Sequence, residues 1–149
     1  MCTGNTCRSP IAQALFLEIL AQNGDYQNVQ VEVLSAGLYT HDGIPATAEA
    51  IEAMHKEGID LSAHKARVIS DNLVKQSDLI LTMTETHCSH LRNKYPEQRA
   101  LIFTLSEYAG IGIQDIDDPY GLGGQAYRKI VQQMKVLLED VADRLLANI

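Results

Sequence analysis

The sequence has 149 residues, 46% of them hydrophobic, which is enough chain for one domain around a single core. Twelve Lys and Arg stand against nineteen Asp and Glu, giving a formal net charge of −7. This balance excludes the clustered basic surface that nucleic-acid binding requires, and it leaves no polybasic patch for a membrane surface. We therefore expect a single monomeric domain over residues 1–149, with no nucleic-acid partner and no membrane partner.

The three cysteines are an odd number and do not suggest a disulfide framework, so a reducing compartment is expected. No apolar run approaches the roughly 20 residues of a membrane span. Met1 leads straight into a polar loop rather than into a basic and then apolar segment, so no secretory signal is expected. These features together predict a cytoplasmic protein.

The first predicted element is a helix that begins at the Ser9-Pro10 pair. Serine is favoured as a helix N-cap, and proline is favoured at the first helical position. Gly24 is expected to end this helix. Its apolar side chains recur at helical spacing, at Ile11, Leu15, Phe16, Ile19 and Leu20.

Strands and helices alternate through the rest of the chain. Val29, Val31 and Val33 alternate with polar residues, which predicts a strand that ends near Leu34. The other expected elements are a helix after Pro45, a buried strand at residues 79–81, a helix at residues 85–94, a strand at residues 101–103 and an amphipathic helix from Ile130 to Leu145. This alternation predicts a doubly wound α/β fold with its site at the carboxyl ends of the strands.

Residues 2–10 read Cys-Thr-Gly-Asn-Thr-Cys-Arg-Ser-Pro and carry the predicted chemistry. A thiol and a guanidinium stand at the two ends of a loop that opens directly into a helix. Gly4 and Asn5 tolerate left-handed backbone, so the loop can curl until successive N–H groups point inward, and the helix dipole adds to the attraction for an anion. The predicted phosphate-binding loop comprises Thr3, Gly4, Asn5, Thr6, Cys7, Arg8 and Ser9.

Cys2 is the predicted nucleophile of this loop. The inward N–H groups favour its thiolate form, and the Ser9 hydroxyl can donate to the sulfur. Arg8 can hold two phosphate oxygens with its planar fork. The predicted proton donor for the leaving group is Asp118, which Pro119 holds in an extended conformation, and Tyr120 supplies an aromatic wall beside the substrate.

With these motifs assembled, the chain resembles the low-molecular-weight protein tyrosine phosphatase family over essentially its whole length. The matching motifs are Cys-x5-Arg-Ser-Pro at residues 2–10, Ser-Ala-Gly at 35–37, Gly-Ile-Asp at 58–60, His-Lys-Ala-Arg at 64–67 and Asp-Pro at 118–119. In that family the cysteine forms a phosphocysteine, the arginine binds the phosphoryl group, and the aspartate protonates the leaving group and then activates water. By resemblance these catalytic roles fall to Cys2, Arg8 and Asp118.

The resemblance also implies a four-stranded parallel sheet with helices on both faces and the phosphate loop after strand 1. That strand is expected to be truncated, because only Met1 precedes Cys2. A supporting polar network would comprise Asn5, Ser9, Ser35 and His64. Cys7 has two interpretations, a buried side chain that fills space or a reversible disulfide partner that shields Cys2 from overoxidation.

Thr6 is the predicted specificity residue, together with Tyr120. The run at residues 2–10 is similar to the bacterial branch of the family that removes phosphate from arginine, where the threonine acts as a selectivity filter. A polar Thr6 offers a hydrogen bond to a planar guanidinium, and the Asp118 carboxylate can orient a phosphoguanidinium. We therefore hypothesise a protein arginine phosphatase acting on phosphorylated proteins, with a protein tyrosine phosphatase as the alternative.

Two further hypotheses rank lower. A thioredoxin-linked arsenate reductase shares Cys-x5-Arg and the Asp-Pro pair, but it needs two further cysteines, and only Cys88 is available beyond the loop. A phosphate-binding module without turnover is suggested by the shortened first strand. No cofactor is expected, and no metal either, because the histidines flanking Cys88 have no second cluster to complete four ligands.

Overall fold

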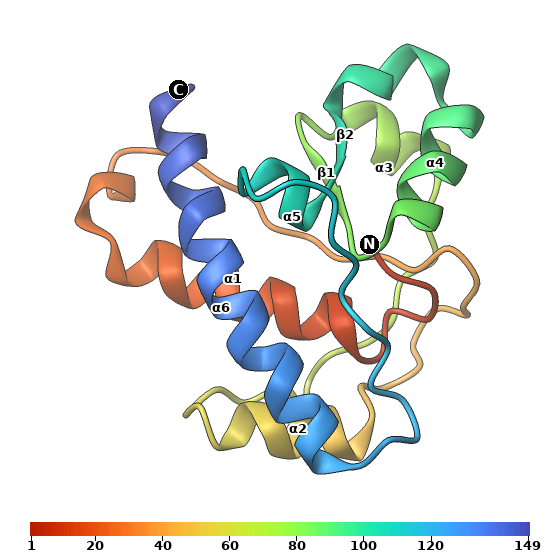
Figure 1. The fold of residues 1–149 in the computed structure, drawn as a ribbon, viewed down its shortest axis with the longest axis vertical. Coiled ribbons are helices and arrows are strands. Elements are labelled where there is room, and N and C mark those ends of the chain that lie inside the picture. Colours follow the sequence, from red (N-terminus) through yellow and green to blue (C-terminus); the bar gives the residue numbers. More distant parts are fainter.

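The computed structural model describes Met1 to Ile149 as an α/β fold (Figure 1). Two parallel strands lie at its centre, β1 (Ile80–Thr82) and β2 (Ile102–Thr104), with Ile80 opposite Ile102. Around them lie the α-helices α1 (Arg8–Gln22), α2 (Ala48–His55), α3 (Asp71–Gln76), α4 (Glu85–Lys94), α5 (Leu105–Tyr108) and α6 (Gly124–Ala147), and the 3₁₀ helices η1 (Gly24–Tyr26) and η2 (Pro96–Leu101). The helix predicted at residues 85–94 is confirmed as α4.

Helices cover both faces of the two strands, as predicted. Successive side chains of a strand point to opposite faces. Ile80 and Ile102 therefore face α3 and α4, in a cluster with Val74, Cys88, Leu91 and Tyr95. Leu81 and Phe103 instead contact the main core, a cluster of 21 buried residues contributed largely by α1, α2 and α6.

The last helix, α6, carries the clearest apolar stripe of the chain. Its buried side chains recur three and four residues apart, at Tyr127, Ile130, Val131, Met134, Leu137, Leu138, Val141 and Ala142. We expected this stripe to lie on the sheet, but it packs mainly against α1, α2 and α5. None of the helices combines the length and the apolar character that crossing a membrane would need.

The hydrogen-bonded sheet has two strands where four were expected. Beside this sheet, three further segments are joined to one another only by isolated parallel bridges, from Cys2 to Gly37 and from Gly37 to Val68. Residues 29–34, which the valine alternation predicts as a strand, form no strand. The sequence prediction therefore holds for the α/β class, and the four-stranded sheet is not formed here.

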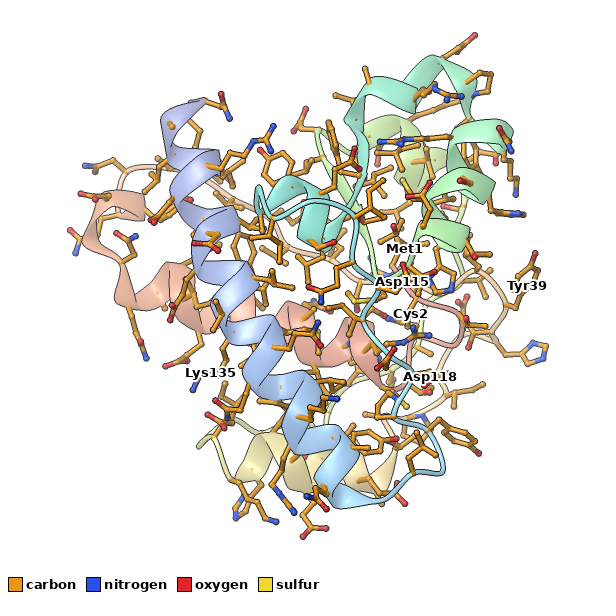
Figure 2. The ribbon with its side chains drawn as sticks, in the orientation of Figure 1. Met1, Cys2, Tyr39, Asp115, Asp118 and Lys135 are labelled. Atoms are coloured by element: carbon orange, nitrogen blue, oxygen red, sulfur yellow. The ribbon has the colours of Figure 1, made fainter.

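The reason lies in a gap between residues 29–35 and β1. An apolar cavity of about 620 Å³ separates them. The Met1 backbone lies beside β1: its amino group donates to the Leu81 carbonyl at 2.8 Å, and the Met83 N–H donates to the Met1 carbonyl at 3.1 Å. Figure 2 labels Met1 close to Cys2 in the view. Because a strand needs a neighbour for its backbone groups, residues 29–34 have no ladder to join.

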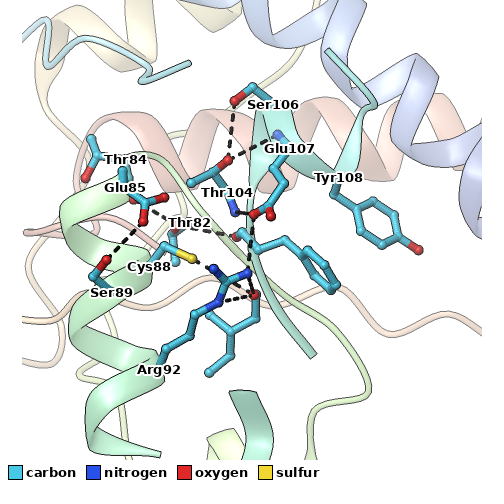
Figure 3. A network of polar contacts seen from close by, with 12 residues as sticks. Thr82, Thr84, Glu85, Cys88, Ser89, Arg92, Thr104, Ser106, Glu107 and Tyr108 are labelled. Atoms are coloured by element: carbon cyan, nitrogen blue, oxygen red, sulfur yellow. Dashed lines mark hydrogen bonds and ion pairs between the residues drawn. The ribbon is translucent and has the colours of Figure 1, made fainter. Parts of the chain in front are cut away.

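A polar network fixes α4 against β2 (Figure 3). The Arg92 guanidinium donates to the Ile102 carbonyl from Nε at 2.9 Å and from Nη2 at 2.6 Å, and Nη2 lies 3.3 Å from Oε2 of Glu107. Glu107 and Thr104 form a reciprocal capping box at the start of α5. These contacts hold the C-terminal half of α4 in place, so the first turn of the helix has a fixed position relative to the strand ends.

Candidate active site

The phosphate loop joins the Cys2 bridge to the start of α1. Cys2 is buried, and its backbone is held on one side by a bond from its N–H to the Ala36 carbonyl at 3.4 Å. The loop then reverses through Asn5, the one non-glycine residue with positive φ, at 54°. This conformation is uncommon for L-residues and is best tolerated by asparagine and aspartate, which explains the choice of residue at this point.

The Cys2 sulfur lies among hydrogen-bond donors. The Asn5 backbone N–H donates to Sγ at 3.3 Å, and the Ser9 hydroxyl lies 2.9 Å from Sγ. Donors directed at a sulfur stabilise the thiolate, the form that attacks phosphorus. The structure thus places the predicted nucleophile and the predicted hydroxyl donor within hydrogen-bond distance of each other.

All four members of the predicted polar network meet at Asn5. Its side-chain amide donates to the hydroxyls of Ser9 at 2.8 Å and Ser35 at 2.9 Å. His64 Nε2 lies 2.8 Å from the Asn5 carbonyl. The structure adds a fourth contact, because the backbone N–H of Arg67 donates to the Asn5 side-chain carbonyl at 2.8 Å. The Asn5 side chain is fully buried, so these bonds replace its water.

Gly37 lies under the loop where the two backbones meet. A Cβ atom at this position would lie 2.8 Å from the Thr3 carbonyl oxygen and 3.0 Å from the Asn5 backbone nitrogen. Both are backbone atoms and cannot move aside as a flexible side chain could. The sequence motif Ser-Ala-Gly at residues 35–37 therefore ends in the one residue that lets the loop approach this closely.

Arg8 and Asp118 approach each other across the site. Nη1 of Arg8 donates to the Ile116 carbonyl at 2.9 Å, and Nη2 lies 3.6 Å from Oδ2 of Asp118. The Arg8 side chain is 6% exposed and the Asp118 side chain 55% exposed. Asp118 therefore lies at the solvent side of a buried guanidinium. Figure 2 shows Asp118 on the same side of the molecule as Cys2.

A cavity of about 700 Å³ opens beside the loop. Thr6 and Tyr120, the two predicted specificity residues, both line it. Gly4, Tyr39, Thr40, His41, Ile44, Pro45 and Thr47 complete the lining. Tyr120 is 70% exposed and is free to contact a ligand. The sequence did not indicate Tyr39 and Ile44, whose exposed apolar surfaces become neighbours of the loop only through the fold.

Cys7 is buried, and its polar partners are hydroxyl groups. Its sulfur lies 3.2 Å from Oη of Tyr127 and 3.7 Å from Oγ1 of Thr47. The two hydroxyls lie 3.1 Å from each other. Burial, and then the contact with Cys7, raise the pKa of Tyr127 well above its usual range, so the phenol is a neutral donor. All three cysteines are free thiols here, and the disulfide role of Cys7 stays a prediction.

His87 is a site neighbour that sequence reasoning placed only in an improbable metal cluster. Its Nε2 lies 2.9 Å from Oγ1 of Thr3 in the phosphate loop. No group of three or more His, Cys, Asp and Glu side chains is placed to hold a metal ion anywhere in the structure. The helix prediction for residues 85–94 already placed His87 in a first turn after a strand end, and that position was the available signal.

Comparisons with known proteins agree with this geometry. A family model described as low molecular weight phosphotyrosine protein phosphatase matches residues 1–149. The chain is 34% identical to a protein-arginine-phosphatase of Bacillus subtilis strain 168 over 145 residues, covering 97% of this chain and 93% of the relative. It is 38% identical to a probable low molecular weight protein-tyrosine-phosphatase, EpsP, of Ralstonia solanacearum, covering 80% of this chain and 75% of the relative.

A solved structure is similar throughout. It is described as the YwlE arginine phosphatase with a phosphorylated active-site serine in place of a cysteine, and it superposes with a TM-score of 0.89 at 34% identity, covering 97% of this chain and 91% of that one. The chain belongs to the low-molecular-weight phosphotyrosine protein phosphatase family. It is a cysteine-dependent protein phosphatase with an α/β phosphatase fold.

Proposed function

We propose that this phosphatase removes phosphate from arginine side chains of proteins, with Cys2, Arg8 and Asp118 as its catalytic residues. The observation that carries the proposal is the position of Thr6, a small polar residue, on the wall of the cavity beside the phosphate loop. Two relatives named protein-arginine-phosphatase, from Bacillus subtilis and Geobacillus stearothermophilus, align over 97% of the chain and support this substrate.

The reaction proceeds in two displacements on phosphorus. In the first, the Cys2 thiolate attacks, an S–P bond forms, the P–N bond to the guanidine breaks, and Asp118 gives its proton to the leaving nitrogen. In the second, water attacks the phosphocysteine, Asp118 takes a proton from that water, and the S–P bond breaks to return the thiolate. Arg8 and the loop N–H groups hold the phosphoryl oxygens in both steps, and Ser9 stabilises the departing thiolate.

Selectivity comes from the groups beside the phosphoryl site. A phosphoguanidinium is planar and carries N–H donors. The Thr6 hydroxyl and the Asp118 carboxylate can accept hydrogen bonds from these N–H groups. A bulky apolar residue in place of Thr6 would remove one acceptor and favour a phenyl ring. Such a difference is worth about 1–3 kcal/mol, which gives preference rather than exclusion.

The test is kcat/KM on matched phosphoarginine and phosphotyrosine peptides, with Cys2→Ser as the blank. We expect a preference for phosphoarginine, and a shift toward phosphotyrosine in Thr6→Ile. An unchanged preference in Thr6→Ile would rule out the filter role. Thr86→Ile, at an exposed position on α4, is the matched control for adding the same side chain away from the cavity.

The alternative substrate is phosphotyrosine. It is favoured by the tyrosine-phosphatase names of several relatives and by the exposed aromatic rings of Tyr39 and Tyr120 beside the loop. A phosphotyrosine preference in the wild type would keep the two displacements described above and change only the substrate.

The two lower-ranked hypotheses have distinct outcomes. Cys88, the one cysteine outside the loop, is fully buried on the inner face of α4, and burial raises the pKa of its thiol. It is therefore a poor relay for the disulfide that arsenate reduction needs, and strong arsenate reduction with thioredoxin would overturn this judgement. Tight phosphate binding without hydrolysis would instead identify a binding module. We further propose that the domain acts as a monomer in a reducing compartment, where Cys2 stays a thiol.

A further inference from the structure

The first turn of α4 contacts both halves of the active site. The backbone N–H of Glu85, the first residue of α4, donates to Oδ1 of Asp115 at 2.8 Å. Two residues later, Nε2 of His87 lies 2.9 Å from Oγ1 of Thr3. Asp115 belongs to the loop that carries Asp118, and Thr3 follows Cys2 directly. Figure 2 shows Asp115 between Met1 and Cys2 in the view, above Asp118.

We propose that Asp115 and His87 are positioning residues of the reaction, which fix the proton-donor loop and the phosphate loop to one turn of α4 and thereby to each other. The proposal rests on the catalytic roles proposed above for Cys2 and Asp118. Neither Asp115 nor His87 touches the reacting atoms in this arrangement; each acts through the loop that it holds.

Asp115 anchors the base of the proton-donor loop. The next residue, Ile116, is fully buried, donates its N–H to the Met83 carbonyl at 2.8 Å and accepts from Arg8 at 2.9 Å. Asp117 and Asp118 are exposed, and the one ion pair or hydrogen bond of the Asp118 side chain outside its own loop is the contact with Arg8. Asp118 is therefore held by its chain neighbours, the anchored pair at residues 115–116 before it and the buried Pro119 after it.

The contact also completes α4. The first four N–H groups of a helix lack partners within the helix, and a carboxylate at that end is favoured by the helix dipole. Thr84 accepts from the His87 N–H at 3.2 Å, and Asp115 accepts from the Glu85 N–H. Removing the Asp115 carboxylate leaves one of these donors without a protein partner and frees the base of the loop at the same time.

His87 anchors the phosphate loop on the other side. It is 8% exposed, and burial, followed by the positive charge of Arg8, lowers its pKa to about 4, so the imidazole is neutral at working pH. Its buried Nδ1 has no hydrogen-bond partner, so Nε2 is the one ring nitrogen through which the imidazole is held, by its hydrogen bond with the Thr3 hydroxyl. The Thr3 carbonyl accepts from the Tyr39 N–H at 2.9 Å, so Thr3 is held through both its backbone and its side chain.

The positioning role of Asp115 is tested with a series of aryl phosphates whose phenols have different pKa values. A poor leaving group depends on the proton from Asp118, and a good one does not. We expect Asp115→Ala to lose about tenfold or more in kcat/KM on phenyl phosphate and less than about twofold on 2,4-dinitrophenyl phosphate, within the range that general-acid catalysis supplies. Asp115→Asn keeps an acceptor for the Glu85 N–H and should recover most of the loss.

Two controls accompany this series. Asp117→Ala removes an exposed carboxylate from the same loop, and it should leave the dependence on the leaving group as in the wild type. Asp118→Asn gives the steepest dependence. If Asp115→Ala folds, as judged by its thermal unfolding, and shows the wild-type dependence on the leaving group, the positioning role of Asp115 is wrong.

The positioning role of His87 predicts a different dependence of kcat/KM on the leaving group. His87→Leu should lower kcat/KM by a similar factor, about tenfold, across the whole series, because a displaced phosphate loop affects every substrate alike. Inhibition by inorganic phosphate should weaken in parallel. His87→Gln can still donate near the Nε2 position and should restore both, and Thr86→Ala, at the exposed position between Glu85 and His87, is the matched control. Unchanged phosphate inhibition in His87→Leu would overturn the role of His87.

The same series separates this inference from the proposed function. The proposed chemistry is tested by the activities of the wild type, Cys2→Ser and Asp118→Asn. A wild type without phosphatase activity on any ester would refute it. The positioning roles are tested by the activities of the Asp115 and His87 variants, each compared with an active wild type.

Discussion

The side-chain amide of Asn5 donates to the Ser35 hydroxyl at 2.9 Å, across 30 positions of sequence. This bond ties the turn of the phosphate loop to the residue that begins the Ser-Ala-Gly segment. Ser35 in turn donates to Oε1 of Gln13 on α1 at 2.6 Å. The loop, the segment beneath it and the first helix are thus joined through one buried asparagine.

We expect Asn5→Ala to weaken both stability and catalysis. It removes several buried hydrogen bonds, each worth about 1 kcal/mol, so the free energy of unfolding should fall by roughly 2–3 kcal/mol. The kcat/KM should fall by about tenfold or more, because the loop N–H groups no longer point at the phosphoryl oxygens. Urea unfolding and assays on one peptide check both.

Asn5→Gly separates the two roles of Asn5, its left-handed backbone conformation and its side-chain hydrogen bonds. Glycine accepts the φ of 54° without strain but lacks the amide. If the polar network matters, Asn5→Gly loses activity almost as much as Asn5→Ala; full activity in Asn5→Gly would show that only the backbone conformation counts. Asn28→Ala, at an exposed position before the valine segment, should have little effect.

Gly37→Ala should be strongly destabilising. The new Cβ would lie 2.8 Å from the Thr3 carbonyl oxygen, so either the phosphate loop or residues 36–38 must shift. Overpacking of this kind costs about 1–3 kcal/mol. Thermal unfolding and phosphate inhibition measure the two effects. Gly24→Ala is the matched control, because its nearest atom, 3.9 Å away, is the end of the flexible Gln27 side chain; equal losses in the two variants would contradict the packing argument.

His87 should make the stability of the fold depend on acid. Burial, then the charge of Arg8, lower its pKa from 6.5 to about 4. As pH falls from about 6.5 toward about 4, the unfolded chain takes up a proton here that the folded chain does not, so stability is lost over this range. Carboxylates titrate near its lower end, so the difference between wild type and His87→Gln isolates the histidine.

The measurement is urea unfolding of both proteins at pH 7 and pH 5. The wild type should lose more stability between these values than His87→Gln. His55→Gln, at an exposed position on α2, should behave as the wild type. Parallel losses in wild type and His87→Gln would show that the imidazole is protonated in the folded state above pH 5.

The sequence predicted the elements whose signals are local. The Ser9-Pro10 pair predicted the start of α1, which the structure places at Arg8, and the period of apolar residues predicted the face of α6 that is buried. The loop residues were also predictable, because a thiol, a guanidinium and flexible residues at fixed spacing are meaningful before any fold is known.

The features that sequence missed depend on distant segments. Residues 29–34 have a strand pattern, but a strand also requires a neighbour, and none is formed in the gap. His87 and Asp115 look like ordinary surface residues until β1 and the loop after α5 carry them to the phosphate loop. Tyr127 likewise meets Cys7 across 120 positions, which no local pattern reveals.

The contact between Arg8 and Asp118 gives the resting site an internal competitor. Oδ2 of Asp118 lies 3.6 Å from Nη2 of Arg8. The carboxylate therefore already uses a donor of the guanidinium that an incoming phosphoryl group needs. A chloride or acetate ion offers little more than Asp118 does, whereas a phosphoryl group brings two charged oxygens and can also accept from the loop N–H groups. The site therefore screens anions by valence and shape before chemistry begins, and the exchange frees Asp118 from Arg8, so that its carboxyl group can turn toward the leaving group.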